Sequence, residues 1–220
     1  MAESEPASPW QTRAPPGPGK PRRQASVSMG WLTHRVLWVP LIVFPAALGI
    51  AAFSFATFSL ELAVVSCLLG WTMLAIAVID ANRFIIPDIL SLPAIPAGLL
   101  ASGRLLEPST SDLVRIDHAI GMLAGGLGLW LVRALYFRIR QREGLGLGDV
   151  KLAAAGGAWI GWQSLSDAIL LAAAMALSLI IVLAVMRGKE LSAAAKVPFG
   201  CFLAPSIWLV WALTAYGRTL

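Results

Sequence analysis

The chain contains 220 residues, of which 58% are hydrophobic and only 13% are charged. Soluble globular domains carry about 25% charged residues, so this composition excludes a soluble fold of this size and indicates a polytopic membrane protein. The net charge of +5 does not indicate a nucleic-acid partner, because the basic residues are dispersed among short segments rather than gathered on one face.

The apolar runs along the chain predict its architecture. Residues 1–30 are rich in Pro, Ser, Gly and Arg and carry no apolar periodicity, so we expect a disordered tail there. Residues 31–220 are expected to form one transmembrane domain, an all-α polytopic helical bundle of about seven spans, each close to the roughly 20 residues that cross a bilayer. The expected spans are 36–58, 60–79, 88–102, 118–137, 150–163, 166–186 and 197–216.

Two features qualify these spans. The run at 36–58 is longer than the about 7–15 residues of a signal-peptide core, which favours a retained span over a cleaved one. Gly121 with Gly125, and Gly157 with Gly161, have the small-xxx-small spacing that lets helices approach closely, so we interpret these glycines as packing residues.

The distribution of Lys and Arg predicts a cytoplasmic amino terminus. With that orientation only Arg104, Arg115 and Arg218 fall outside, and the other fourteen of the 17 basic residues lie in cytoplasmic segments. Because an excess of Lys and Arg on the cytoplasmic side sets membrane orientation, this bias indicates which interface each loop faces.

Two acidic residues are predicted to meet at one membrane surface. Asp80 ends the second expected span and Asp149 opens the fifth, and the two spans between them return the chain to the same side. In a partly dehydrated site, two neighbouring carboxyl groups disfavour double ionisation, so we expect them to share one proton. Such a pair can activate water with one member and protonate an amide with the other.

Helix capping is the alternative role for these acids. Asp is a preferred N-cap residue, and both Asp88 and Asp149 directly precede apolar runs. For Asp88 we favour capping, and composition alone would also favour it for Asp149. Asp80 lies at the end of a helix, where the macrodipole disfavours negative charge, so it is the stronger functional candidate.

Three segments carry more specific information. The first is Ile79-Asp80 followed by Ile86-Pro87-Asp88-Ile-Leu-Ser-Leu-Pro93, and the second is Gly146-Leu-Gly-Asp149-Val-Lys151 with the small residues after it. The third is Val197-Pro198-Phe199-Gly200, followed by Pro205. A lone G-x-G-D is a weak signal, but these segments in this order resemble the type IV prepilin peptidases, membrane aspartyl proteases of the GxGD class.

The resemblance implies a function and a site. It places the catalytic residues at Asp80 and Asp149, in a transmembrane peptidase domain over 31–220 whose active site faces the cytoplasm from the inner membrane. The implied substrates are prepilins or pseudopilins, cut between a basic leader and a hydrophobic helix. Lys151 and Asp88 match motif positions without a catalytic role, and Lys151 is expected to extend toward the lipid headgroups.

The resemblance implies no cofactor and no metal, in agreement with the residues themselves. Cys67 and Cys201 lie apart in apolar runs, and His34 and His118 are isolated, so no zinc cluster or disulfide framework is predicted. Residues 1–58 contain no cysteine. Because the bifunctional family members carry a cysteine-paired amino-terminal domain linked to methylation, we expect a peptidase-only form.

Three other functions are alternatives to a prepilin peptidase. A secondary transporter would place ionisable groups near the middle of the membrane, whereas every acid here falls in the tail, a loop or the edge of an expected span. A scaffold subunit would tolerate Asn at positions 80 and 149. A related intramembrane protease of the same motif class would act on another signal-anchored substrate.

Overall fold

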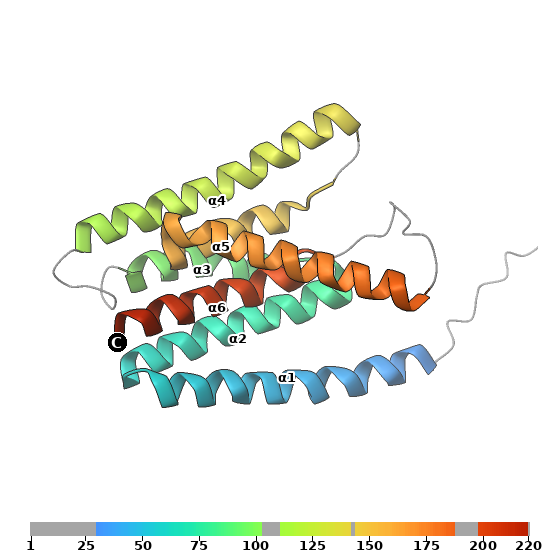
Figure 1. Ribbon diagram of the computed structural model, residues 1–220, viewed down its shortest axis with the longest axis horizontal. Helices are drawn as coiled ribbons and strands as arrows, with labels where there is room; N and C mark the ends of the chain where they lie inside the picture. Colours follow the sequence, from blue (N-terminus) through green and yellow to red (C-terminus); the bar gives the residue numbers. More distant parts are fainter. Residues whose placement is uncertain (1–29, 103–110, 142–143, 188–197, 220) are drawn as a thin grey trace, which may run out of the picture. The chain divides into compact units, whose positions relative to one another are not determined.

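The computed structural model describes residues 30–102, 111–141, 144–187 and 198–219. These residues form helices α1 (Gly30–Thr57), α2 (Leu60–Arg83), α3 (Asp88–Ala101), α4 (Ser111–Arg140), α5 (Leu147–Arg187) and α6 (Gly200–Thr219), with no strand among them (Figure 1). The predicted all-α class is therefore confirmed. The expected tail at 1–30 lies outside the described residues, apart from Gly30 at the start of α1.

The chain separates into two compact units, Met1–Leu37 and Trp38–Leu220. The described part of the first unit is only the beginning of α1, and all packing considered below lies within the second. The assignment of 31–220 as one peptidase domain stays a prediction.

Among the described residues, five helices are long and apolar enough to cross a membrane: Pro40–Thr57, Leu60–Arg83, Asp112–Arg140, Leu147–Met186 and Gly200–Gly217. The apolar helix Asp88–Ala101 is shorter. The expectation of about seven spans is compatible with this arrangement, because α5 contains two of the expected spans, 150–163 and 166–186.

Helix α5 turns back on itself at Gly161, and Figure 1 shows its two halves running in opposite directions. Gly161 has φ 75° and ψ 176°, a conformation that glycine adopts without the steric penalty of a side chain. The amide of Trp162 then donates to Oδ2 of Asp117 on α4, 3.2 Å away, so Asp117 caps the second half of the helix. The sequence placed this break between residues 163 and 166.

The first half of α5 is the centre of the bundle. It carries Leu152 and Ala153, which are fully buried, and α5 packs against α3, α4 and α6, while α6 also packs against α2. Small residues permit the close approach of α4: a Cβ atom on Gly157 would overlap the carbonyl oxygen of Gly121, and one on Gly125 would overlap the carbonyl oxygen of Ala153. The predicted packing role is confirmed for Gly121, Gly125 and Gly157, whereas Gly161 forms the turn of α5.

Polar contacts join α1, α2 and α6. The hydroxyl oxygens of Ser54 and Ser66, both fully buried, lie 2.8 Å apart. The indole Nε1–H of Trp208 donates to the Ser66 hydroxyl at 3.2 Å. These bonds satisfy polar groups inside an otherwise apolar core, as buried polar groups require.

The Gly157 contact generates a stability prediction. Gly157→Ala should lower the free energy of unfolding by about 1–3 kcal/mol, the usual cost of overpacking a close contact. Gly128→Ala on α4 is the matched control, because nothing lies within 4 Å of its Cβ position. Denaturant unfolding of the purified variants in detergent micelles measures both, and equal losses in the two would contradict the packing role.

Candidate active site

Asp80 lies in the last turn of α2 and is 5% exposed. The helix closes directly after it: Phe84 adopts a left-handed conformation with φ 56°, and its amide donates to the carbonyl oxygen of Asp80 at 2.8 Å. The backbone of Asp80 therefore terminates the helix while its side chain points into the protein. A charged residue is almost never this buried without a compensating partner, which marks Asp80 as a special position.

The amino-terminal end of α6 supplies partial compensation. The backbone amides of Gly200 and Cys201 lie within hydrogen-bonding reach of the Asp80 carboxyl group. A helix N-terminus presents unpaired N–H groups and a partial positive charge, which suit a carboxylate. Oδ2 of Asp80 nevertheless has no hydrogen-bond partner among the described protein residues. An unsatisfied buried carboxyl oxygen requires an explanation, and a catalytic role is one of them.

Asp149 lies in the first turn of α5 and is half-buried. Helix α5 begins at Leu147, and the backbone of Gly146, the residue before it, lies within hydrogen-bonding reach of the Asp149 carboxyl group. This is the reciprocal contact of a capping box, in which the third helical residue reaches back to the residue before the helix. Asp149 is therefore not the N-cap residue that its place before an apolar run suggested, because α5 begins two residues before it, but this contact orients its carboxyl group.

The structure brings Asp80 and Asp149 together. The two carboxyl groups lie within electrostatic range of one another. Ile86, which is buried, lies between the segments that carry them: a Cβ atom on Gly148 would approach the Cβ of Ile86 to 2.9 Å, and one on Gly200 would approach its Cδ1 to 2.6 Å. All three sequence segments singled out above thus meet around one side chain.

Two carboxyl groups in one partly dehydrated site can act as an acid–base pair. A shared proton lets one group accept a proton from water while the other donates to a leaving amide. The shared proton belongs to the pair, so either carboxyl group can take either role.

Two residues at the start of α6 were missed as site components by reasoning from the sequence. Gly200 touches Asp80, since a Cβ atom on it would lie 2.8 Å from Oδ2. The half-buried thiol of Cys201 lies within electrostatic range of both acids, whereas the sequence placed Cys201 only within an apolar run. Their position after the Val-Pro-Phe segment was the available signal. Within the described part of the chain, no three His, Cys, Asp or Glu residues are arranged to hold a metal ion.

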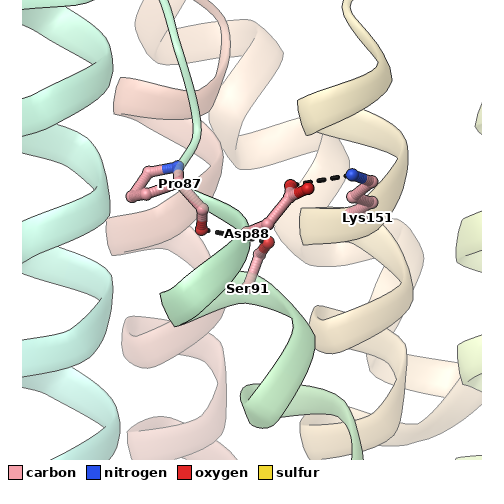
Figure 2. A network of polar contacts seen from close by, with 4 residues as sticks. All are labelled: Pro87, Asp88, Ser91 and Lys151. Carbon is pink, nitrogen blue, oxygen red and sulfur yellow. Dashed lines mark hydrogen bonds and ion pairs between the residues drawn. The ribbon is translucent and has the colours of Figure 1, made fainter.

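An ion pair beside the site ties α3 to α5. Nζ of Lys151 donates to Oδ1 of Asp88 at 2.7 Å, as Figure 2 shows. The prediction that Asp88 caps α3 is wrong: Pro87 holds the N-cap position, no side chain caps it, and the Ser91 hydroxyl donates to the Pro87 carbonyl oxygen at 3.2 Å. Lys151 therefore pairs with Asp88 rather than only extending toward headgroups.

We predict a modest coupling energy for this pair. Side-chain exposures of 35% for Lys151 and 58% for Asp88 place it among partly exposed ion pairs, which contribute about 0.2–1 kcal/mol. A double-mutant cycle with Asp88→Asn and Lys151→Met, followed by chemical unfolding, measures the coupling. The looser Arg115–Asp112 pair, at 3.9 Å, is the control and should couple more weakly. If the effects of Asp88→Asn and Lys151→Met on the free energy of unfolding were simply additive, the result would contradict a stabilising ion pair.

Comparisons with known proteins point to one family. The model of the type IV leader peptidase family matches residues 67–183, a range that contains both acids. The prepilin leader peptidase/N-methyltransferase of Pseudomonas aeruginosa is 38% identical over 146 residues, which cover 66% of this chain and 48% of that protein. The protein of the same name from Aeromonas hydrophila is 37% identical over 146 residues, which cover 66% of this chain and 48% of that protein. The one from Dickeya chrysanthemi is 37% identical over 133 residues, which cover 60% of this chain and 44% of that protein.

The extent of these matches is limited in two respects. The chain spans about half the length of the curated relatives it matches. No solved structure matches it.

Proposed function

This chain belongs to the type IV leader peptidase family, and we propose that it is a membrane aspartyl endopeptidase that removes the leader peptide from type IV prepilins or pseudopilins. The observation that carries the proposal is the meeting of Asp80 and Asp149 around Ile86 and the start of α6. The substrate class follows from the relatives, which are named prepilin leader peptidases.

In the proposed reaction the two carboxyl groups act on opposite sides of the scissile bond. The ionised carboxylate takes a proton from a water molecule, whose oxygen attacks the carbonyl carbon. The protonated carboxyl group donates its proton to the amide nitrogen, which leaves as the new amino terminus. General acid–base assistance of this kind contributes about 10²–10⁴-fold to a rate.

The proposal concerns peptide hydrolysis alone. A carboxyl pair accounts for cleavage of an amide, whereas the methyl transfer in the names of the relatives needs different chemistry. We place the site at the cytoplasmic face of the inner membrane. The support is that Arg83 ends α2 beside Asp80 and that Lys151 follows Asp149 by two residues, and basic flanks mark the cytoplasmic side.

Replacement of either acid tests the proposal directly. Asp80→Asn and Asp149→Asn should each reduce prepilin processing by at least about 10²-fold, because an amide cannot exchange the required proton. Co-expression with a prepilin and the mobility shift on loss of the leader measure processing. Asp167→Asn, an exposed acid in the second half of α5, is the control and should process normally.

The outcomes separate the competing functions. Unchanged processing by both Asn variants would reject the protease and favour a scaffold subunit. Proton flux into proteoliposomes that depends on Asp80, without any cleavage, would instead favour a transporter.

A second prediction concerns Gly200. Gly200→Ala should reduce kcat/KM for processing by about tenfold or more, because its Cβ would displace Asp80, and a misplacement of about 1 Å can cost about 100-fold. Gly217→Ala in the same helix has nothing within 4 Å of its Cβ and should process like wild type. The same thermal unfolding midpoint for both variants shows that the loss is local. Full activity of Gly200→Ala would contradict the contact.

A further inference from the structure

An apolar groove runs between α2 and α3. It has a volume of about 360 Å³, and Val65, Leu68, Leu69 and Thr72 of α2 form one wall. The other wall is formed by residues of α3, including Ile89, Pro93 and Ala97, and Trp159 of α5 completes the lining. No charged side chain lines it.

The groove exists because α3 packs mainly on α5 and touches α2 only lightly. The indole Nε1–H of Trp159 donates to the carbonyl oxygen of Ala94 at 2.8 Å, which fixes α3 against α5. The small side chains Pro93, Ala94 and Ala97 then leave space beside the larger leucines of α2.

The polar groups of Thr72 and Trp159 in the lining are already hydrogen-bonded within the protein. The hydroxyl of Thr72 donates to the carbonyl oxygen of Leu68 at 2.7 Å, and the Trp159 N–H is already bonded. An occupant therefore needs no matching polar group. Because lipid tails are as apolar as the lining, the occupant is held by van der Waals packing rather than by withdrawal from water.

One end of the groove points along α2 toward Asp80. Ile89, in the first turn of α3, is three residues beyond Ile86, which lies against Gly148 and Gly200. On α2, Asp80 lies eight residues beyond Thr72, about 12 Å along the helix axis. Leu69 and Asp80 are eleven residues apart, which places them on roughly the same face of α2.

We infer that this groove binds the apolar segment that follows the cleavage site in the substrate. The inference rests on the proposed function: a substrate whose scissile bond lies at Asp80 and Asp149 continues from there along the bundle, and the groove is an apolar path between α2 and α3 that begins about 12 Å from Asp80 along α2. A substrate with a hydrophobic helix directly after the cut bond matches this path. A lipid acyl chain has the same apolar chemistry and is the competing occupant.

Site-specific photocrosslinking distinguishes the two occupants. A benzophenone amino acid replaces Ala97 in the groove or, as a matched control, the exposed Ala173 in the second half of α5, each in an Asp149→Asn background that holds uncleaved prepilin. We expect adducts between position 97 and the apolar segment of the prepilin, and none from position 173. Adducts to lipid alone at position 97, or equal prepilin adducts at both positions, would overturn the inference.

Kinetics provide a second readout in an otherwise unmodified enzyme. Ala97→Phe fills the groove and should raise KM for prepilin by about tenfold with little change in kcat, whereas Ala173→Phe should leave both within about twofold. Equal KM values for the two variants would overturn the inference.

Failure of the proposed function has a different signature. If wild type does not cleave prepilin at all but position 97 still forms adducts, the protease proposal fails and the groove assignment stands. If wild type cleaves and position 97 forms no adducts, the groove assignment fails alone.

Discussion

The contact between the end of α2 and the start of α6 is the constraint on which the candidate site depends. It places a carboxyl group that is 5% exposed against the amides of Gly200 and Cys201, where only a glycine leaves room for it. Ile86 fills the remaining space and touches Gly148, the residue directly before Asp149. The position of one acid relative to the other is therefore fixed by backbone packing rather than by long, flexible side chains.

The carboxyl groups of Asp80 and Asp149 are compensated only in part by the surrounding backbone. A carboxyl group withdrawn from water costs free energy unless hydrogen bonds or neighbouring dipoles compensate it. The N-terminus of α6 compensates Asp80, and the Gly146 backbone compensates Asp149, yet Oδ2 of Asp80 keeps no protein partner. A polar group left available in a pre-organised, partly dehydrated site is suited to interact with groups that change charge during a reaction.

The sequence predicted the features that depend on local composition and on the number of membrane crossings. Apolar runs located the helices, and an even number of spans between Asp80 and Asp149 placed these acids on one side, where the structure brings them together. Tertiary contacts were out of reach. The turn at Gly161 depends on Asp117, 45 residues before Trp162, and the Lys151–Asp88 pair joins residues 63 apart. The role of Gly200 likewise depends on a neighbour far away in the chain.

Crosslinking of the two acidic positions tests the shared site most directly. Asp80→Cys and Asp149→Cys are combined in a chain with Cys67→Ala and Cys201→Ala, and the membranes are treated with a short bifunctional thiol reagent. Mass spectrometry should find a bridge between positions 80 and 149. A control chain that combines Asp80→Cys with Asp117→Cys, beside the Gly161 turn, should show no bridge. Bridging to position 117 alone, or to neither position, would contradict a common site.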